Sequence, residues 1–381
     1  MDPPRGAWFR SRSALRVANS DGGGTGEQQF GTALVAGAVL LLAAADGGFF
    51  PSAWRWGAVA LAAAGAVAAF GSQRVSVSRA GSATFAALVL LGCWTTLSAA
   101  WSLDAHASLL ESQRLLLYAV ALAAFLVARR GLVGGVVVGA AAVAVWSLVD
   151  RGGRDAFEGT LLVGPIGYAN ALGALVAMAA VAALCLRGRA LLSLVVLIPA
   201  LALTNSRGAE AAALVGAAVG GALLLGRRRA ALAVLAAAVT ALVVLLVMPI
   251  GGLGDRTSYW STARAVVPRH VVGGSGAGTF AEVYRTERPA GPSARNAHSL
   301  YLETLDETGV VGLVLLLATL ALPLAAGIAR GGAAAPAVGG YVVFIVHAGV
   351  DWDWTMPVVA VAALALAAAQ TVGTLPRWRV A

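Results

Sequence analysis

Long apolar stretches, separated by short polar ones, repeat along most of this chain. Each runs for about 15–22 residues, the length at which a helix crosses the roughly 30 Å hydrocarbon core of a bilayer. The pattern predicts an all-α fold, a polytopic bundle of about twelve transmembrane helices. We expect these spans near residues 30–45, 54–70, 83–100, 114–128, 132–149, 168–186, 190–204, 208–225, 230–249, 309–328, 336–350 and 355–373. Several are short, so the count could be about ten to thirteen.

Composition supports a membrane protein. Of the 381 residues, 59% are hydrophobic and only 12% are charged, which excludes an ordinary soluble domain. The two cysteines, Cys93 and Cys185, both fall inside apolar stretches. We interpret them as small packing residues rather than as a disulfide or ligands of a metal.

The polar segments predict how the chain is divided. We expect residues 1–29 to be a disordered cytoplasmic tail, 30–373 an integral membrane domain, and 374–381 a short cytoplasmic tail. Residues 250–308 are the one loop long enough to build a small subdomain between spans.

The arginines predict the orientation of the chain in its membrane. With the N-terminus in the cytoplasm, the inner segments hold 16 of the 27 arginines and three of the 18 acidic residues. Cytoplasmic loops of membrane proteins carry such an excess of positive charge. Both termini are therefore predicted to be cytoplasmic, and the loop 250–308 extracytoplasmic. The net charge of +9 then reflects topology, so it gives no support to nucleic-acid binding.

Arg207 is an unusual charge, because it stands between two apolar spans. The bland interpretation is a boundary arginine that pairs with Glu210, three residues further on. The alternative is an anion-binding group, since Arg207 begins a predicted helix and its charge adds to the positive helix N-terminus. Such an arrangement favours a phosphate.

The loop 250–308 opens with a predicted amphipathic helix over residues 255–264. We expect it to lie along the membrane interface, with Trp260 at the depth of the lipid headgroups. The glycine-rich segment 273–280 follows, and it is either a cradle for phosphate or a plain flexible turn. No Lys-Ser/Thr pair comes after it, so it is not a nucleotide-binding P-loop.

The same loop ends in Asn296-Ala-His-Ser-Leu-Tyr-Leu-Glu-Thr-Leu-Asp-Glu-Thr-Gly309. Within it, His298 is either a packed or capping residue or a general base, because histidine titrates near neutrality. Nearby arginines would make its proton easier to lose. His347, with Asp351 and Asp353, has the spacing of a metal site or proton relay but lacks a further strong ligand, so we favour a structural role.

Several of these segments resemble the O-antigen ligase and O-antigen polymerase family of bacterial membrane glycosyltransferases. The resemblance covers about residues 90–370. It is carried by TNSRGA at Arg207, by Arg256-x-x-x-Trp260, by GGSGAGTF, by NAHSLYLETLDETGVVG at His298, and by WTTLSAAWS, GPIGYANALG and HAGVDWDWTMP.

The resemblance implies a glycan donor on a polyprenyl pyrophosphate at the outer face of the bacterial inner membrane. The glycan passes to an acceptor hydroxyl on a glycan, lipid, wall polymer or protein, without a metal or other cofactor. By their motifs, Arg207 and Arg256 would bind the pyrophosphate and His298 would be the base. We add Arg264, from its spacing alone, with Trp260 and Tyr301 as substrate-binding residues.

The chemistry of the transfer fits such a set. Cations stabilise the negative charge of the departing phosphate, and a base activates the acceptor hydroxyl. We expect the hydroxyl to attack opposite the leaving group, which inverts the configuration at the anomeric carbon. The loop 250–308 is short for a ligase that holds lipid A, which favours polymerases or simpler ligases. The sequence does not distinguish a polymerase from a ligase.

Two other classes stand as alternatives. A transporter or flippase of lipid-linked glycans would also have about twelve spans, yet transporters usually show two related halves with polar breaks in both. Here the polar residues gather on one side, mostly in one late loop. A non-catalytic assembly or sensor protein would leave the basic cluster without a substrate.

Overall fold

The computed structural model describes residues 8–71, 76–150, 159–247, 254–287 and 293–372. All regular structure in these residues is helical, which confirms the all-α fold class. The helices are α1 (Trp8–Ala43), α2 (Pro51–Gly71), α3 (Arg79–Ser98), α4 (Ala105–Ala128), α5 (Leu132–Val149), α6 (Ala169–Leu186), α7 (Leu194–Thr204), α8 (Arg207–Leu224), α9 (Arg228–Val247), α10 (Arg256–Val266), α11 (Phe280–Glu287), α12 (Leu300–Arg330), α13 (Ala335–His347) and α14 (Pro357–Thr371).

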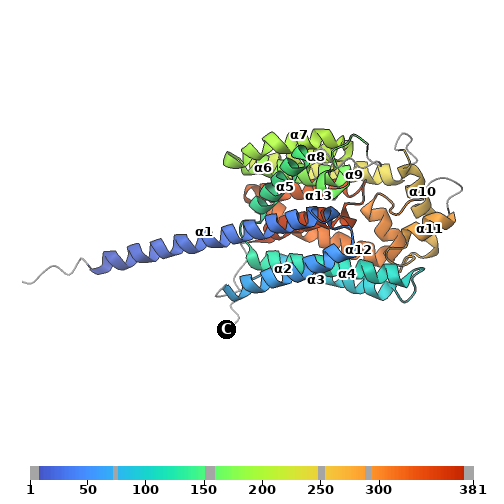
Figure 1. Ribbon diagram of the computed structural model, residues 1–381, viewed down its shortest axis with the longest axis horizontal. Helices are drawn as coiled ribbons and strands as arrows, with labels where there is room; N and C mark the ends of the chain where they lie inside the picture. The colour runs from blue at the N-terminus through green and yellow to red at the C-terminus, as the bar shows by residue number, and fades with distance from the viewer. Residues whose placement is uncertain (1–7, 72–75, 151–158, 248–253, 288–292, 373–381) are drawn as a thin grey trace, which may run out of the picture.

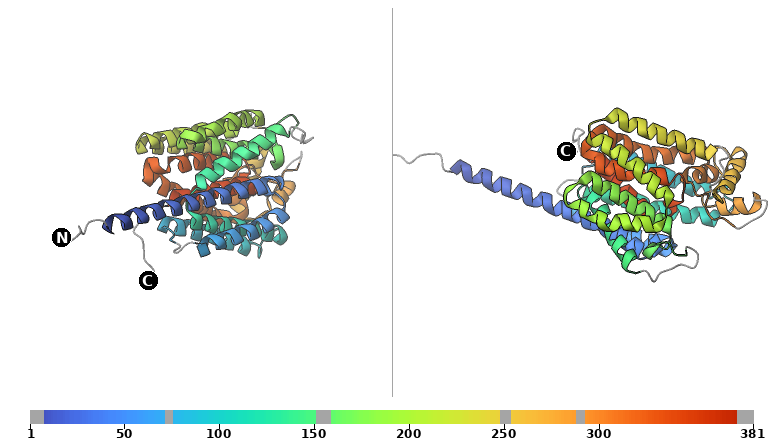
Figure 2. Two further views of the ribbon diagram at one scale, coloured as in Figure 1. Left: turned by 60° about the vertical axis from the view of Figure 1, so that its left-hand side comes forward. Right: turned by 90° about the horizontal axis from the view of Figure 1, so that it is seen from above.

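Most of these helices lie side by side in one bundle, as both figures of the whole molecule show (Figures 1 and 2). Inside it, α14 is buried along nearly its whole length, and so is most of α6. Alanine is the commonest residue in both helices, which lets neighbouring helices approach closely. The outer surface exposes large apolar side chains, among them Trp56, Phe70 and Leu214. Such a surface suits contact with lipid chains rather than with water.

Each expected span overlaps a helix of the described residues, and several extend past its ends. By length and composition, eight helical stretches of the described residues can cross a membrane, and one of these is the 48-residue stretch Leu300–His347, which joins α12 and α13. Two shorter apolar stretches, Gly188–Thr204 and Pro357–Thr371, also occur. The chain is thus a multi-pass helical membrane protein, and the count of about twelve spans stays a prediction.

The N-terminal part differs from our expectation of a disordered tail over residues 1–29. In the structure α1 already begins at Trp8 and continues without a break to Ala43. It projects from one end of the bundle (Figure 1). Residues 1–7, like the C-terminal tail 374–381, lie outside the described residues. The cytoplasmic location of both tails stays a prediction.

Between α9 and α12 the chain folds α10 and α11 at the opposite end of the bundle from the projecting part of α1 (Figure 1). Behind them α12 is broken at Gly309, whose φ is 67° and ψ −169°. The break frees the carbonyls of Asp306 and Glu307. They accept hydrogen bonds from the N–H groups of Ser275 and Gly276, at 2.9 and 2.8 Å.

The glycine-rich turn is therefore bound to α12, and this corrects its interpretation as a phosphate cradle or a flexible turn. The N–H groups of residues 274–278 and of Phe280 already have acceptors inside the protein. A side chain at Gly274, where φ is +69°, would meet the backbone of Glu307 at 2.2 Å. Glycine is required there because the turn and the helix touch backbone to backbone.

A stripe of small residues fastens α5 to α1. Gly135 and Gly139 stand one turn apart on α5, and a Cβ on Gly135 would come within 2.6 Å of the Val35 Cβ on α1. At the start of the stripe the Thr32 hydroxyl donates to the carbonyl of Gly131 at 3.1 Å. Small residues at such spacing allow close packing between membrane helices.

We expect Gly135→Ala to lower the thermal stability of the purified protein by about 1–3 kcal/mol, because the added methyl group overpacks the contact of α5 with α1. Gly134→Ala is the matched control, since its Cβ would make only an ordinary 3.5 Å contact with Thr32. The control gains up to about 1 kcal/mol of helix propensity. Melting followed by tryptophan fluorescence measures both. Equal melting temperatures would contradict the close packing.

Candidate active site

The carboxylate of Asp351 joins three distant parts of the chain. It accepts hydrogen bonds from Arg256 on α10 at 2.9 Å, from the Tyr168 hydroxyl at 2.8 Å, and from the Asn170 amide at 2.8 Å. Asp351 is only 1% exposed. A buried carboxylate is costly unless charges and hydrogen bonds compensate it. The ion pair with Arg256 therefore holds α10 on the end of the bundle.

Arg256 keeps part of its hydrogen-bonding capacity free. One terminal nitrogen binds Asp351, whereas the buried Nε has no partner in the described residues. The side chain is 35% exposed. A buried donor without a partner is rare in a folded protein and calls for an explanation. Because Nε itself is buried, an anion would be bound by the terminal nitrogens of the partly exposed guanidinium, which Asp351 orients.

His298 lies within electrostatic range of Arg256, just before a helix rather than on one. It comes before the N-cap of α12, Ser299, and its φ of 51° is in the left-handed region. A non-glycine residue in a sparsely populated backbone region costs about 1–3 kcal/mol unless its surroundings hold it there. Two contacts do so: the ring stacks on Tyr259 at 5.2 Å, and the Trp260 indole donates to the His298 carbonyl at 3.4 Å.

The His298 ring is arranged to accept a proton. Its Nδ1 is 3.2 Å from the carbonyl oxygen of Asn296. A carbonyl can only accept, so in the neutral ring Nδ1 carries the hydrogen and Nε2 has the free lone pair. Burial lowers the pKa of His298 below its ordinary value, although the negative charge of Asp351 acts in the opposite direction. The lowered pKa favours the neutral ring, and the hydrogen on Nδ1 leaves Nε2 as the free base.

Arg207 begins α8 directly after its N-cap, Ser206, as the sequence predicted. The side chain is exposed and forms no hydrogen bond or ion pair with the described part of the chain, so the expected pairing with Glu210 is absent. Its two neighbours contact His347: the Ser206 hydroxyl lies 3.5 Å from Nε2, and a Cβ on Gly208 would lie 3.2 Å from the ring.

The segment 347–353 thus connects the two predicted phosphate ligands. His347 contacts the residues on either side of Arg207 and binds Asp353 through Nδ1 at 2.5 Å. Asp351, in the same segment, binds Arg256. Both aspartates and His347 are buried. The structure therefore brings His298 and Arg256 together and places Arg207 at the same end of the bundle. No hydrogen bond links Arg207 directly to the other two.

The three predicted substrate-binding residues have internal partners. Arg264 donates to the last carbonyls of α9, Leu246 and Val247, at 2.5 and 2.9 Å. The Tyr301 hydroxyl donates to a carbonyl of α13 at 2.8 Å. Trp260 is 2% exposed, so its expected position among lipid headgroups is wrong. All three hold the loop on the bundle, and their contact with a substrate stays a prediction.

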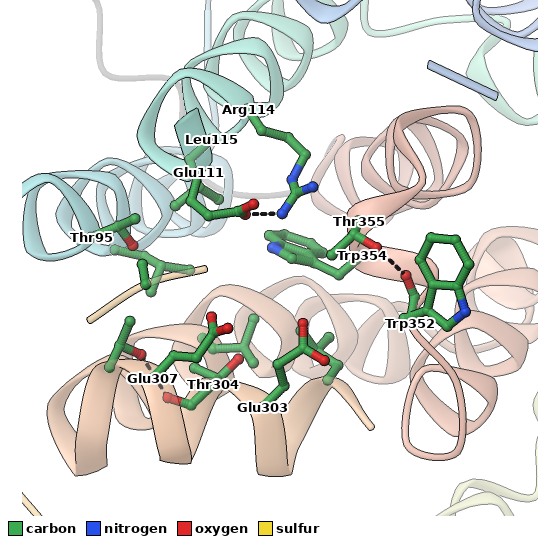
Figure 3. Close-up of a pocket in the computed structure, with 15 residues that line it drawn as sticks. Thr95, Glu111, Arg114, Leu115, Glu303, Thr304, Glu307, Trp352, Trp354 and Thr355 are labelled. Atoms are coloured by element: carbon green, nitrogen blue, oxygen red, sulfur yellow. Dashed lines mark hydrogen bonds and ion pairs between the residues drawn. The ribbon is translucent and has the colours of Figure 1, made fainter. Parts of the chain in front are cut away.

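A second group of charges, on the other side of Trp352, was not predicted. Figure 3 shows Glu303 and Glu307 on α12 facing Glu111 and Arg114 on α4 across a cavity of about 50 Å³. Arg114 is ion-paired with Glu111. The one signal in the sequence was Arg114 at the edge of an apolar span. The Trp352 ring lines this cavity and also meets the His298 ring at 6.4 Å.

Comparison with known proteins bears on this end of the molecule. No curated protein matches the chain. Residues 192–317 match the family model described as O-Antigen ligase, and this segment contains Arg207, Arg256 and His298. The resemblance found in the sequence is thereby confirmed for the segment 192–317, which is similar to the O-antigen ligase family.

Proposed function

We propose that this protein is a membrane glycosyltransferase that moves a glycan from a polyprenyl pyrophosphate to an acceptor hydroxyl. The observation that supports the proposal is His298, whose Nδ1 faces a carbonyl oxygen, within electrostatic range of the partly exposed guanidinium of Arg256, inside the segment that matches the O-antigen ligase family. A base and a phosphate-binding cation at one site are what transfer from a pyrophosphate donor requires.

The proposed step balances as follows. The acceptor oxygen attacks the anomeric carbon from the face opposite the pyrophosphate, and its proton passes to His298 Nε2. The bond from that carbon to the phosphate oxygen breaks, and its electron pair leaves with the polyprenyl pyrophosphate. The configuration at the carbon inverts. Arg256 and Arg207 stabilise the charge that develops on the leaving group, and Arg256 is held in place for this by Asp351.

Purified protein in lipid nanodiscs tests the proposal. It is incubated with a defined polyprenyl-pyrophosphate glycan and a panel of acceptors, either a second donor molecule, a lipid or a wall polymer, and products are read by mass spectrometry. We expect glycosylated acceptor and free polyprenyl pyrophosphate in equal amounts. Product on the second donor would identify a polymerase, and product on another acceptor a ligase. An intact donor with every acceptor would contradict the proposal.

We expect the rate of transfer to be constant near pH 7–8 and to fall about tenfold per pH unit well below the lowered pKa of His298, because an imidazolium cannot accept a proton. Asp351, Arg256 and Asp255 supply the charges that act on this ring. Initial rates between pH 5 and pH 8 measure it. His298→Ala should cost about 10²–10⁴-fold, whereas His106→Ala, at an exposed histidine, should keep the wild-type profile. A wild-type rate of transfer in His298→Ala would show that His298 is not the general base.

We expect Arg207→Ala to reduce transfer by about 10²–10³-fold, because a charge on the leaving pyrophosphate loses its partner. Arg207→Lys should recover only part of the rate, since lysine cannot form the two parallel hydrogen bonds of a guanidinium. Arg189→Ala, at another exposed arginine, is the control and should transfer normally. Equal rates in the Arg207 and Arg189 variants would make Arg207 a mere boundary charge.

A double variant separates the two roles of Arg256. Arg256→Gln alone should lower both the melting temperature and the rate, because it leaves Asp351 buried without its cation. Adding Asp351→Asn removes that buried charge, so we expect the melting temperature to recover while transfer stays about 10²-fold low. Full recovery of transfer in the double variant would show that Arg256 acts only through the fold.

A further inference from the structure

Glu303 reaches back from α12 to the segment that carries His298. One carboxylate oxygen accepts a hydrogen bond from the Asn296 side-chain amide at 3.0 Å, and the other accepts from the backbone N–H of Ala297 at 2.6 Å. These are the two residues directly before His298. The carbonyl of Asn296 is in turn the partner of His298 Nδ1, at 3.2 Å. The carboxylate thus reaches the imidazole through a single residue.

The contacts on the other side of the segment do not fix that carbonyl. Trp260 donates to the carbonyl of His298 itself, and the N–H of Leu300 donates to a carbonyl of the segment after α13. Both contacts fix the backbone on the C-terminal side of His298, the residue with the left-handed φ. Among the described residues, only Glu303 forms hydrogen bonds with the N–H groups of Asn296 and Ala297, the two residues before His298. Rotation of the peptide after Asn296 would carry its carbonyl away from Nδ1 and free either ring nitrogen to take the hydrogen.

Both oxygens of the Glu303 carboxylate accept hydrogen bonds from N–H donors, the side-chain amide of Asn296 and the backbone of Ala297. Glu307, one turn further along α12, has a parallel arrangement with the N–H groups of Gly278 and Phe280, at 2.8 and 3.0 Å. Both carboxylates face the same cavity (Figure 3). The two therefore hold different arms of the loop, and only the arm of Glu303 leads to His298.

We infer that Glu303 is a positioning residue for His298: through Asn296 and Ala297 it sets the ring tautomer in which Nε2 is the free base. The inference rests on the proposed function of His298 and deepens it. A hydrogen-bond partner on one ring nitrogen decides which nitrogen is left to react, and such partners are needed for full activity. Here a carboxylate exerts this control by way of a backbone carbonyl instead of by direct contact.

The test compares Glu303→Gln with Glu307→Gln. Glutamine keeps the shape and offers one acceptor oxygen, so at position 303 it retains one of the two hydrogen bonds. The chain has only four histidines, so ¹⁵N-histidine labelling with NMR in micelles resolves the tautomer of each ring, and His298→Gln assigns the signal. We expect a mixed tautomer at His298 in Glu303→Gln and the wild-type tautomer in Glu307→Gln.

Transfer kinetics give a second readout. Glu303→Gln should lower kcat about tenfold and leave the KM for the polyprenyl-pyrophosphate donor within about twofold, because the base and not the binding site is altered. If Glu303→Gln does not fold, Asn296→Ala removes one of the same hydrogen bonds and should shift the tautomer likewise. A wild-type tautomer in the folded variant, or equal shifts in Glu303→Gln and Glu307→Gln, would overturn the inference.

The two proposals fail in different ways. A shifted tautomer in Glu303→Gln together with full transfer by His298→Ala would support the positioning contact and remove the base from the mechanism. An unshifted tautomer together with an inactive His298→Ala would keep the base and remove Glu303 from its control.

Discussion

The ion pair between Arg256 and Asp351 is the contact on which this end of the molecule depends. Asp351 is withdrawn from water, and a carboxylate in that position is tolerated only because Arg256, Tyr168 and Asn170 all bind it. The pair joins the loop helix α10 to α6 and to the segment after α13. Under the proposed function, contacts of this kind would orient Arg256 before the substrate binds, as electrostatic stabilisation of a leaving group requires.

Trp352 separates two regions of opposite charge. On one side lie Arg256 and His298, and on the other the cavity lined by Glu111, Glu303 and Glu307 with the single cation Arg114. Carboxylates repel a pyrophosphate, so under the proposed function the donor would bind on the side of Arg256. A transporter would instead be expected to carry charged or broken helices in both halves of the chain. The one broken helix next to these charges, α12, uses its free carbonyls to bind the glycine-rich turn.

The sequence was sufficient for properties that depend on periodicity and local order. Apolar stretches located the helices, and the position of Arg207 at a helix start followed from the polar stretch before it. The family motif selected His298. What failed were the partners of polar side chains. Arg264 and Tyr301 bind backbone carbonyls of α9 and α13, and nothing in the residues around them encodes such distant acceptors.

The hydrogen-bond partners of the acidic residues on α12 could not be predicted from the sequence either. Glu303 and Glu307 stand one helical turn apart in the sequence, but their partners lie in two other segments, and no local pattern identifies these partners. The glycine-rich turn was ambiguous for this reason as well, because its acceptors are carbonyls some thirty residues later. Trp260 was placed at the surface because an amphipathic helix alone does not show that a second layer, with Phe280 and Tyr284, covers it.

The central claim is that Arg207, Arg256 and His298 form one site. The most direct test is a cryo-electron microscopy structure of the protein with a non-transferable analogue of a polyprenyl-pyrophosphate glycan. We expect the pyrophosphate between Arg207 and Arg256, within hydrogen-bonding distance of both guanidinium groups, and the anomeric carbon turned toward His298 Nε2. A pyrophosphate bound at another end of the bundle, or one that leaves His298 and either arginine on separate surfaces, would contradict a single catalytic site.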